Sequence, residues 1–165
     1  MFMLSKSIKP IQKPWPQIVV GGKKNRLITI TCREADGVNL VLNYEDSPQF
    51  IEWLKERVDF INSKLHRYNR NSEEFEISTF NNITLFNSEE ELDRTVDHLI
   101  QSYEKQNIKL TKEQILKNLF IGYTEDIKQK ITQAEELGVG KIVISEIRGG
   151  SSIDDPLRLF RDKIM

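Results

Sequence analysis

The chain has 165 residues, of which 30% are charged and 38% hydrophobic, and its formal net charge is −1. This length suffices for one domain with a core, and the near-neutral charge gives no electrostatic case for binding nucleic acid or an acidic membrane. The single cysteine, Cys32, excludes an internal disulfide and is interpreted as an inert helix residue. No apolar run approaches the roughly 18 residues of a membrane span, and the N-terminal stretch lacks the apolar segment of a signal peptide, so we expect a cytoplasmic protein.

The first elements are a proline-containing lead-in and a strand. Residues 1–16 hold three prolines, which favour extended conformations, and residues 17–165 follow as a single α/β domain. Residues 17–20 are a continuous apolar run that predicts a strand, ended by Gly21 and Gly22.

A short helix and a second strand come next. Residues 23–35 lack helix breakers and carry apolar residues at helical spacing. Asp36 is interpreted as a turn residue rather than a catalytic carboxylate, and Gly37 as a left-handed C-cap. Residues 38–42 then predict a buried strand.

A long helix and a third strand occupy the middle of the chain. Ser47 and Pro48 form a helix start signal. The apolar stripe that follows is Phe50, Leu54, Val58, Ile61 and Leu65. The next strand is expected within residues 75–86.

Two capping boxes are predicted in the second half. Ser88 with Glu91 opens one helix, and Thr111 with Gln114 opens another. A further helix over residues 124–137 then precedes the fourth strand.

That strand is predicted over residues 141–147, and a last helix begins at Asp155 and Pro156. Because four short strands, apolar on both faces, alternate with helices, we predict a parallel sheet with right-handed crossovers.

Two turns are candidate anion sites. Gly21 and Gly22 sit at the carboxyl end of a strand before a helix, where bare backbone and unpaired amides favour an oxyanion, and Lys23 and Lys24 add positive charge. Arg148 begins a Gly-Gly-Ser-Ser loop after the last strand, where barrels often bind phosphate. The structural alternative for Gly21 and Gly22 is a tight strand-to-helix turn. For the loop after Arg148 it is a flexible connection.

Other polar residues are interpreted as structural. His66 and His98 lack metal-ligand spacing, and residues 89–91 form a charged first turn of a helix rather than a metal cluster.

Three stretches resemble the luciferase-like monooxygenase family of flavin- and deazaflavin-dependent oxidoreductases. They are KPWPQIVVGG with READGVNLV, then FIGYTEDIKQKITQAEELGVGKIVI, then DPLRLFRDKIM. The matching residues are Pro14, Pro16, Ile18, Val20, Gly21, Gly22, Ala35, Asp36, Gly37, Asn39, Phe120, Gly122, Glu125, Leu137, Gly138 and Val139. The blocks occur in the family's order and together cover residues 9–165.

The resemblance implies a specific part of a fold. The family is a (β/α)8 barrel of roughly 250 residues or more, and the matched blocks belong to its second half, strands five to eight. Most ring contacts and the catalytic groups of the family lie in the missing half, so no catalytic residue is carried over.

The resemblance also implies a cofactor, FMN or a deazaflavin coenzyme. Gly21 and Gly22 match the loop beside its phosphate. Where the family usually continues with x-Gly-Glu, this chain has Lys23, Lys24 and Asn25, and the lysines can compensate by charge.

A half-barrel leaves open edges and an uncovered inner face. A second copy, a separately encoded N-terminal half-barrel chain, or a rearranged doubly wound sheet would cover them. We therefore expect an oxidoreductase fragment that is inactive alone and needs a complementary half or self-association. The alternative is a non-catalytic remnant that binds a flavin phosphate or only oligomerises.

Overall fold

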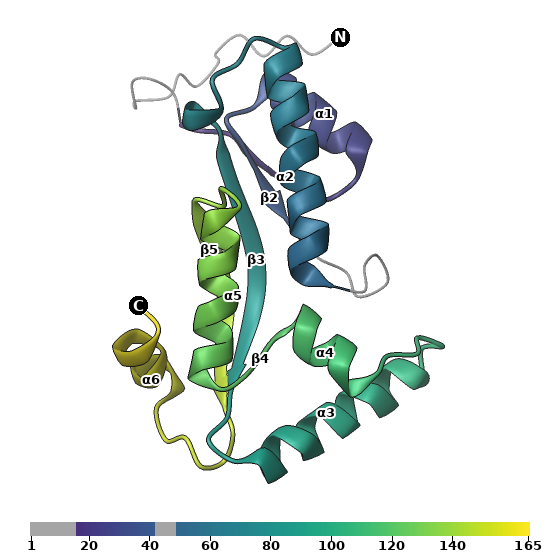
Figure 1. The fold of residues 1–165 in the computed structure, drawn as a ribbon, viewed down its shortest axis with the longest axis vertical. Helices are drawn as coiled ribbons and strands as arrows, with labels where there is room; N and C mark the ends of the chain where they lie inside the picture. The colour runs from purple at the N-terminus through teal and green to yellow at the C-terminus, as the bar shows by residue number, and fades with distance from the viewer. Residues whose placement is uncertain (1–15, 42–48) are drawn as a thin grey trace, which may run out of the picture.

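The computed structural model describes residues 16–41 and 49–165, so the lead-in up to residue 15 and the start signal at Ser47 and Pro48 lie outside the described residues. The first elements are β1 (Val19–Gly21), α1 (Asn25–Glu34), β2 (Gly37–Leu40), α2 (Phe50–Arg67), a short 3-10 helix (Ser72–Glu74) and β3 (Glu76–Leu85) (Figure 1). The remaining elements are α3 (Glu89–Glu104), α4 (Lys112–Asn118), β4 (Phe120–Gly122), α5 (Thr124–Glu136), β5 (Lys141–Gly149) and α6 (Pro156–Lys163).

The five strands within the described residues all pair in parallel, which confirms the predicted α/β fold class. The strands β1, β2, β3 and β5 lie side by side in chain order, so the sheet is not doubly wound. Along one edge β3 pairs with β2 at Glu76–Thr79 and with β4 at Ile83–Leu85, while β5 pairs along its other edge. The sequence did not predict β4, because three residues are too few to show a strand period.

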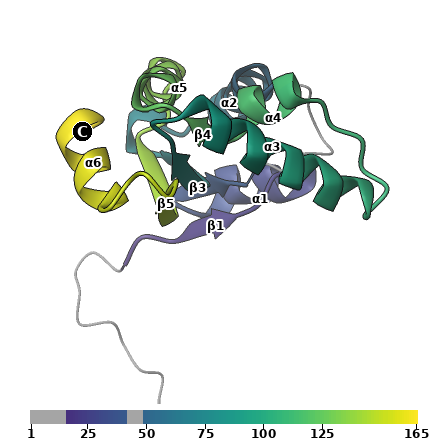
Figure 2. The same ribbon diagram turned by 90° about the horizontal axis from the view of Figure 1, so that it is seen from below.

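One apolar core lies on a single face of the sheet, beneath α1, α2, α5 and α6. Figure 2 shows α2 and α5 on the same side of β3 and β5. The most deeply buried members of this core are Ile28, Cys32, Val38, Leu40, Phe50, Leu54, Ile61, Leu65, Ile83, Leu85, Phe120, Ile127 and Ala134. Phe50 of α2 meets Phe120 of β4 edge to face, with ring centroids 5.3 Å apart, so the long helix is joined to the added strand.

A smaller core joins α3, α4 and β4 at the carboxyl end of β3. Its buried members are Phe86, Leu92, Val96, Ile115 and Ile121. The pairing of Ile121 with Thr84 places this cluster on the side of the sheet opposite the main core. At its carboxyl end, this second face of the sheet is therefore partly covered by α3.

The opposite face of β3 and β5, which we call the inner face, is mainly polar, with Phe80 and Val143 as an adjacent apolar pair. Ser78, Asn82 and Thr84 of β3 alternate with the buried core residues, and Glu146 and Arg148 extend the same row on β5. Phe80 is the large apolar side chain of this row on β3, and it is 43% exposed. The prediction that the strands are apolar on both faces is therefore wrong for β3 and β5, because helices cover the inner face only at the carboxyl end of β3.

Several local predictions can be compared directly with the structure. The Thr111–Gln114 capping box is confirmed, and Asp155 caps α6 by accepting from the Arg158 backbone N–H. Gly37 is not a left-handed cap. It is the first residue of β2, and a Cβ there would lie 2.6 Å from the Glu76 carbonyl oxygen, so close strand approach explains the glycine.

The Ser88–Glu91 capping box is wrong. The Ser88 side chain makes no cap hydrogen bond, although Ser88 is the N-cap residue of α3. The Glu91 carboxylate instead accepts hydrogen bonds from the hydroxyls of Ser151 and Ser152, in the loop after β5.

Candidate functional site

A cavity of about 630 Å³ opens on the inner face at the carboxyl ends of β3 and β5. Its floor includes Phe80, Asn82 and Thr84 of β3, and Thr95 and Leu99 of α3 form part of its wall. The lining continues through Val41, Asn81, Phe86, Asn118, Leu119, Phe120, Ile121 and residues 148–151. Ligands of parallel α/β sheets bind at the carboxyl ends of the strands, so this cavity is the candidate site.

Arg148, one of the predicted anion-binding residues, lines this cavity. Its guanidinium lies 2.6 Å from the Glu146 carboxylate, which is two residues earlier on β5. The hydrogen bond between them raises the pKa of Arg148 and lowers the pKa of Glu146. Both side chains are exposed, so an incoming anion would compete with Glu146 for the guanidinium at little cost.

The Gly-Gly-Ser-Ser loop after Arg148 borders the same cavity and already holds an anionic group. The hydroxyl of Ser151 donates to Glu91, and the Ser152 hydroxyl donates to Oε2 of Glu91 at 3.0 Å. The hydrogen bond from Ser151 is the largest cause that lowers the pKa of the Glu91 carboxyl group, and Ser152 adds to it. Sequence reasoning missed this role of Glu91, because its position three residues after Ser88 predicts a local cap.

Gly21 and Gly22 end β1 as predicted, directly before α1. The N–H of Gly22 donates to the Asn39 carbonyl oxygen at 2.9 Å, and a Cβ on Gly22 would overlap the Leu27 side chain. Gly22 also has a φ of +156°, so both packing and conformation favour glycine there.

The start of α1 is open to an anion. A Cβ at Gly21 would meet nothing within 4 Å, and Lys24, the N-cap residue, makes no side-chain cap hydrogen bond. The N-cap side chain therefore leaves the first amides of α1 without a side-chain acceptor, and Lys23 and Lys24 lie directly before them.

The structure does not bring the two predicted anion sites together. Gly21 is in register with Asn39 and Ser78, whereas Arg148 is in register with Thr84, six residues further along β3. Six residues of strand span about 20 Å. One phosphate group cannot contact both sites, although a ligand lying along the inner face could approach each.

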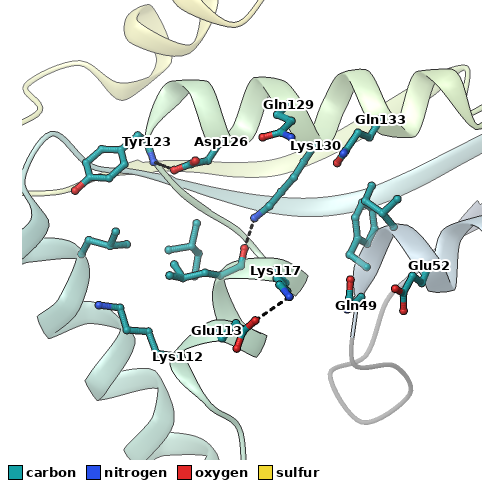
Figure 3. Close-up of a pocket in the computed structure, with 15 residues that line it drawn as sticks. Gln49, Glu52, Lys112, Glu113, Lys117, Tyr123, Asp126, Gln129, Lys130 and Gln133 are labelled. Carbon is teal, nitrogen blue, oxygen red and sulfur yellow. Dashed lines mark hydrogen bonds and ion pairs between the residues drawn. The ribbon is translucent and has the colours of Figure 1, made fainter.

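A larger cavity of about 980 Å³ lies among the helices, between α2, α4 and α5 (Figure 3). The Lys130 amine points into this region and donates to the carbonyl oxygens of Leu116 and Leu119, which end α4. Burial lowers the pKa of Lys130 to about 8. Lys117 pairs with Glu113 at 2.8 Å, so the polar groups here satisfy the protein's own helix ends and charges.

The remaining polar candidates have structural surroundings. The Asp36 carboxylate accepts the Ile18 backbone N–H at 2.8 Å, a tertiary contact to the residue before β1. His66 and His98 are exposed on α2 and α3. Among the described residues, no three His, Cys, Asp or Glu side chains are grouped to hold a metal ion. None of the described helices has the length and apolar character needed to cross a membrane.

No protein-family model and no curated protein sequence matches this chain. Solved structures do match. An F420-dependent secondary alcohol dehydrogenase in complex with an F420–acetone adduct superposes on 92% of this chain and 49% of its own, with a TM-score of 0.67 and 10% identity. A monooxygenase from Streptomyces bottropensis superposes on 93% of this chain and 48% of its own, with a TM-score of 0.62 and 16% identity. The coenzyme F420-dependent tetrahydromethanopterin reductase from Methanopyrus kandleri superposes on 90% of this chain and 50% of its own, with a TM-score of 0.58 and 12% identity.

The chain thus spans about half the length of the solved structures it matches. At these identities the likeness establishes the fold, a set of consecutive parallel β/α units equivalent to about half of these enzymes. It agrees with the fold implied by the luciferase-like resemblance in the sequence.

Proposed function

We propose that the chain is one half of a flavin- or deazaflavin-dependent oxidoreductase of the luciferase-like family, without turnover on its own. The observation that carries this proposal is the match of at least 90% of the chain to only about half of F420-dependent enzymes and a monooxygenase. The motif blocks of the sequence support the same family. The half that is not in this chain would supply the catalytic groups.

The residues present fit the phosphate of a flavin-type coenzyme at the start of α1. Gly21 leaves open space, the first amides of α1 have no side-chain cap, and Lys23 and Lys24 add charge. Arg148 would face the same ligand from the far end of the inner face, and the exposed ring of Phe80 offers an apolar surface between them. The coenzyme would supply the redox chemistry, and this chain would bind and orient it.

A partner is proposed for the inner face and the sheet edges. In the part of the chain that the structure describes, neither β1 nor β5 has a strand on its outer edge. A complementary N-terminal half-barrel chain or a second copy would pair with these edges and cover the inner face. The second half present in each matched enzyme supports a partner of similar size.

Titration of the purified chain with FMN and with a deazaflavin coenzyme, followed by cofactor fluorescence, tests the binding step. We expect saturable binding that Lys23→Ala with Lys24→Ala weakens by about tenfold or more. Lys128→Ala, which removes an exposed lysine of α5, is the matched control. If neither cofactor binds, or if both variants bind equally well, the phosphate assignment is wrong.

Light scattering and native mass spectrometry test the partner. We expect a dimer or larger species when the chain is isolated, or a complex with a separately produced N-terminal half. A strict monomer that binds no apolar dye and ignores such a half would contradict the proposal.

The second candidate is a non-catalytic remnant that keeps only phosphate binding or oligomerisation. The loss of the family's glycine and glutamate after Gly22, and the pairing of Arg148 with Glu146, favour it. Cofactor binding without any turnover, even in a complex with a complementary half, would distinguish it from the first.

A further inference from the structure

The loop from Gly149 to Ser152 holds a carboxylate that comes from 60 residues earlier in the chain. Glu91 accepts hydrogen bonds from the Ser151 and Ser152 hydroxyls. Two hydroxyls that donate to one carboxylate can also donate to another oxyanion, and hydrogen bonds to a charged acceptor are the stronger kind. The loop that the sequence marked as an anion candidate therefore already holds an anion.

The loop is shaped so that the carboxylate can approach it. A Cβ on Gly150 would overlap Oε2 of Glu91 and would lie 3.0 Å from the Phe86 ring. The backbone here is anchored, because the Gly150 N–H donates to the Leu85 carbonyl at 2.8 Å and its own carbonyl accepts from Ile153 at 2.9 Å. A larger residue at this position would force the carboxylate out of the loop.

The hydrogen bonds between Glu91 and the loop take the place of a capping hydrogen bond within α3. Glu91 is the third residue of α3, from which a glutamate can cap the backbone amide of Ser88. It reaches the loop after β5 instead, so the carboxylate links the first turn of α3 to the rim of the 630 Å³ cavity.

We propose that Gly150, Ser151 and Ser152 form a receptor for a phosphate monoester at the carboxyl end of β5, and that the Glu91 carboxylate is a built-in competitor that occupies it. Phosphate oxygens accept hydrogen bonds from the same hydroxyl donors. Arg148 lies two residues before Gly150 on the same cavity wall and adds a positive charge for a dianion. The cavity beside the loop gives room for the organic part of the ligand.

This receptor is separate from the turn at Gly21 and Gly22, and Arg148 is the one residue that it shares with the proposed coenzyme site. A ligand gains access only when the Glu91 side chain swings away from the loop. Competition with Glu91 therefore lowers the affinity for phosphate. A ligand that makes further contacts in the cavity binds tightly enough to displace the carboxylate.

Titration with inorganic phosphate, followed by the backbone amide signals of residues 149–152 in NMR spectra, tests the proposal. We expect Glu91→Ala to bind phosphate about tenfold or more tightly than the natural chain. Glu89→Ala, which removes another carboxylate from the first turn of α3, is the matched control and should leave the affinity unchanged. Adding Ser151→Ala and Ser152→Ala to Glu91→Ala should abolish the gain.

Equal affinity in Glu91→Ala and the natural chain would overturn the proposal, and so would a gain that survives loss of both serines. If Glu91→Ala does not fold, Glu91→Gln keeps one acceptor oxygen and the packing. It should still raise the affinity, and an unchanged affinity would count against the proposal. Lys23→Ala with Lys24→Ala should leave these signals unaffected, so failure of the flavin site and failure of this receptor are distinguishable.

Discussion

The two faces of β3 carry opposite chemistry over the same ten residues. Ile83 and Leu85 are fully buried beneath the helices, whereas Phe80 and Asn82, on the inner face, are exposed. The helix-covered face stabilises the domain, and the inner face leaves polar groups and one aromatic ring available for a ligand or a partner. Stability and binding are thus assigned to different sides of one strand, and substitutions on the two sides should have different consequences.

The largest expected difference is in thiol reactivity. Cys32 is fully buried in the main core, and burial raises the pKa of its thiol to about 11 from an ordinary value of 9.0. At pH 8 the thiolate fraction alone therefore lowers its reaction rate by about a hundredfold. In an Asn82→Cys variant, an aromatic disulfide reagent should modify the introduced thiol rapidly and Cys32 only on unfolding. Rapid labelling of both thiols in the folded protein would contradict the two-face description.

Truncation of the covered face should have the next largest effect. Ile83→Ala leaves a cavity in the main core and should lower the free energy of unfolding by about 2–5 kcal/mol. Asn82→Ala, the adjacent residue on the inner face, should change it by less than about 1 kcal/mol. Urea unfolding followed by circular dichroism measures both. Similar losses in the two variants would mean that the inner face also contributes to stability in the isolated chain.

The buried amine of Lys130, on α5, makes the free energy of unfolding depend on pH. Burial lowers its pKa to about 8 in the folded state, whereas the ordinary lysine value is 10.5. Between these values the unfolded state binds a proton that the folded state lacks, so stability rises with pH across this window and the full penalty applies below pH 8. The stability of the natural chain relative to Lys130→Met should therefore increase from pH 8 to 10.5, by at most about 3 kcal/mol.

Urea unfolding at several pH values measures this difference. Lys128→Met on the exposed side of α5 controls for the loss of a lysine. A constant gap between the natural chain and Lys130→Met over this range would show that burial does not shift the titration.

The smallest expected effect compares two helix starts with the same sequence signature. Thr111 accepts from the Gln114 N–H at 3.2 Å, so Thr111→Ala should cost about 1 kcal/mol of stability. Ser88 makes no such bond, so Ser88→Ala should change the free energy of unfolding by less than about 0.5 kcal/mol. Thermal unfolding of both variants decides this, and equal losses would indicate that Ser88 caps α3 after all.

The sequence predicted most of the fold, because the helices show an apolar stripe at helical spacing and the longer strands are rich in strand-forming residues. The stripe of α2 was found by its period, and β3 was placed within residues 75–86 by its strand-forming residues. The three-residue β4 has no period to detect, and its pairing depends on a strand 35 residues away.

The candidate site was predicted less completely. Gly21, Gly22 and Arg148 do lie at carboxyl ends of strands, but the distance between them follows from the register on β3, which composition and spacing do not encode. Glu91 shows the same limit. Its local pattern is identical in kind to that of Gln114, and only the tertiary position of the loop after β5 decides that the two side chains act differently.

The pairing of β3 with β5 also has a consequence for synthesis of the chain. Ser78 is in register with Lys141, 63 positions later, so one whole edge of β3 has no partner until the ribosome has released the last strand. At about 5–20 residues per second this interval lasts roughly 3 to 13 seconds. A ten-residue strand edge open for that long is a template for pairing with other nascent chains. Yield during expression should therefore depend on what shields β3 before β5 arrives, and slower translation of the intervening residues should lower it.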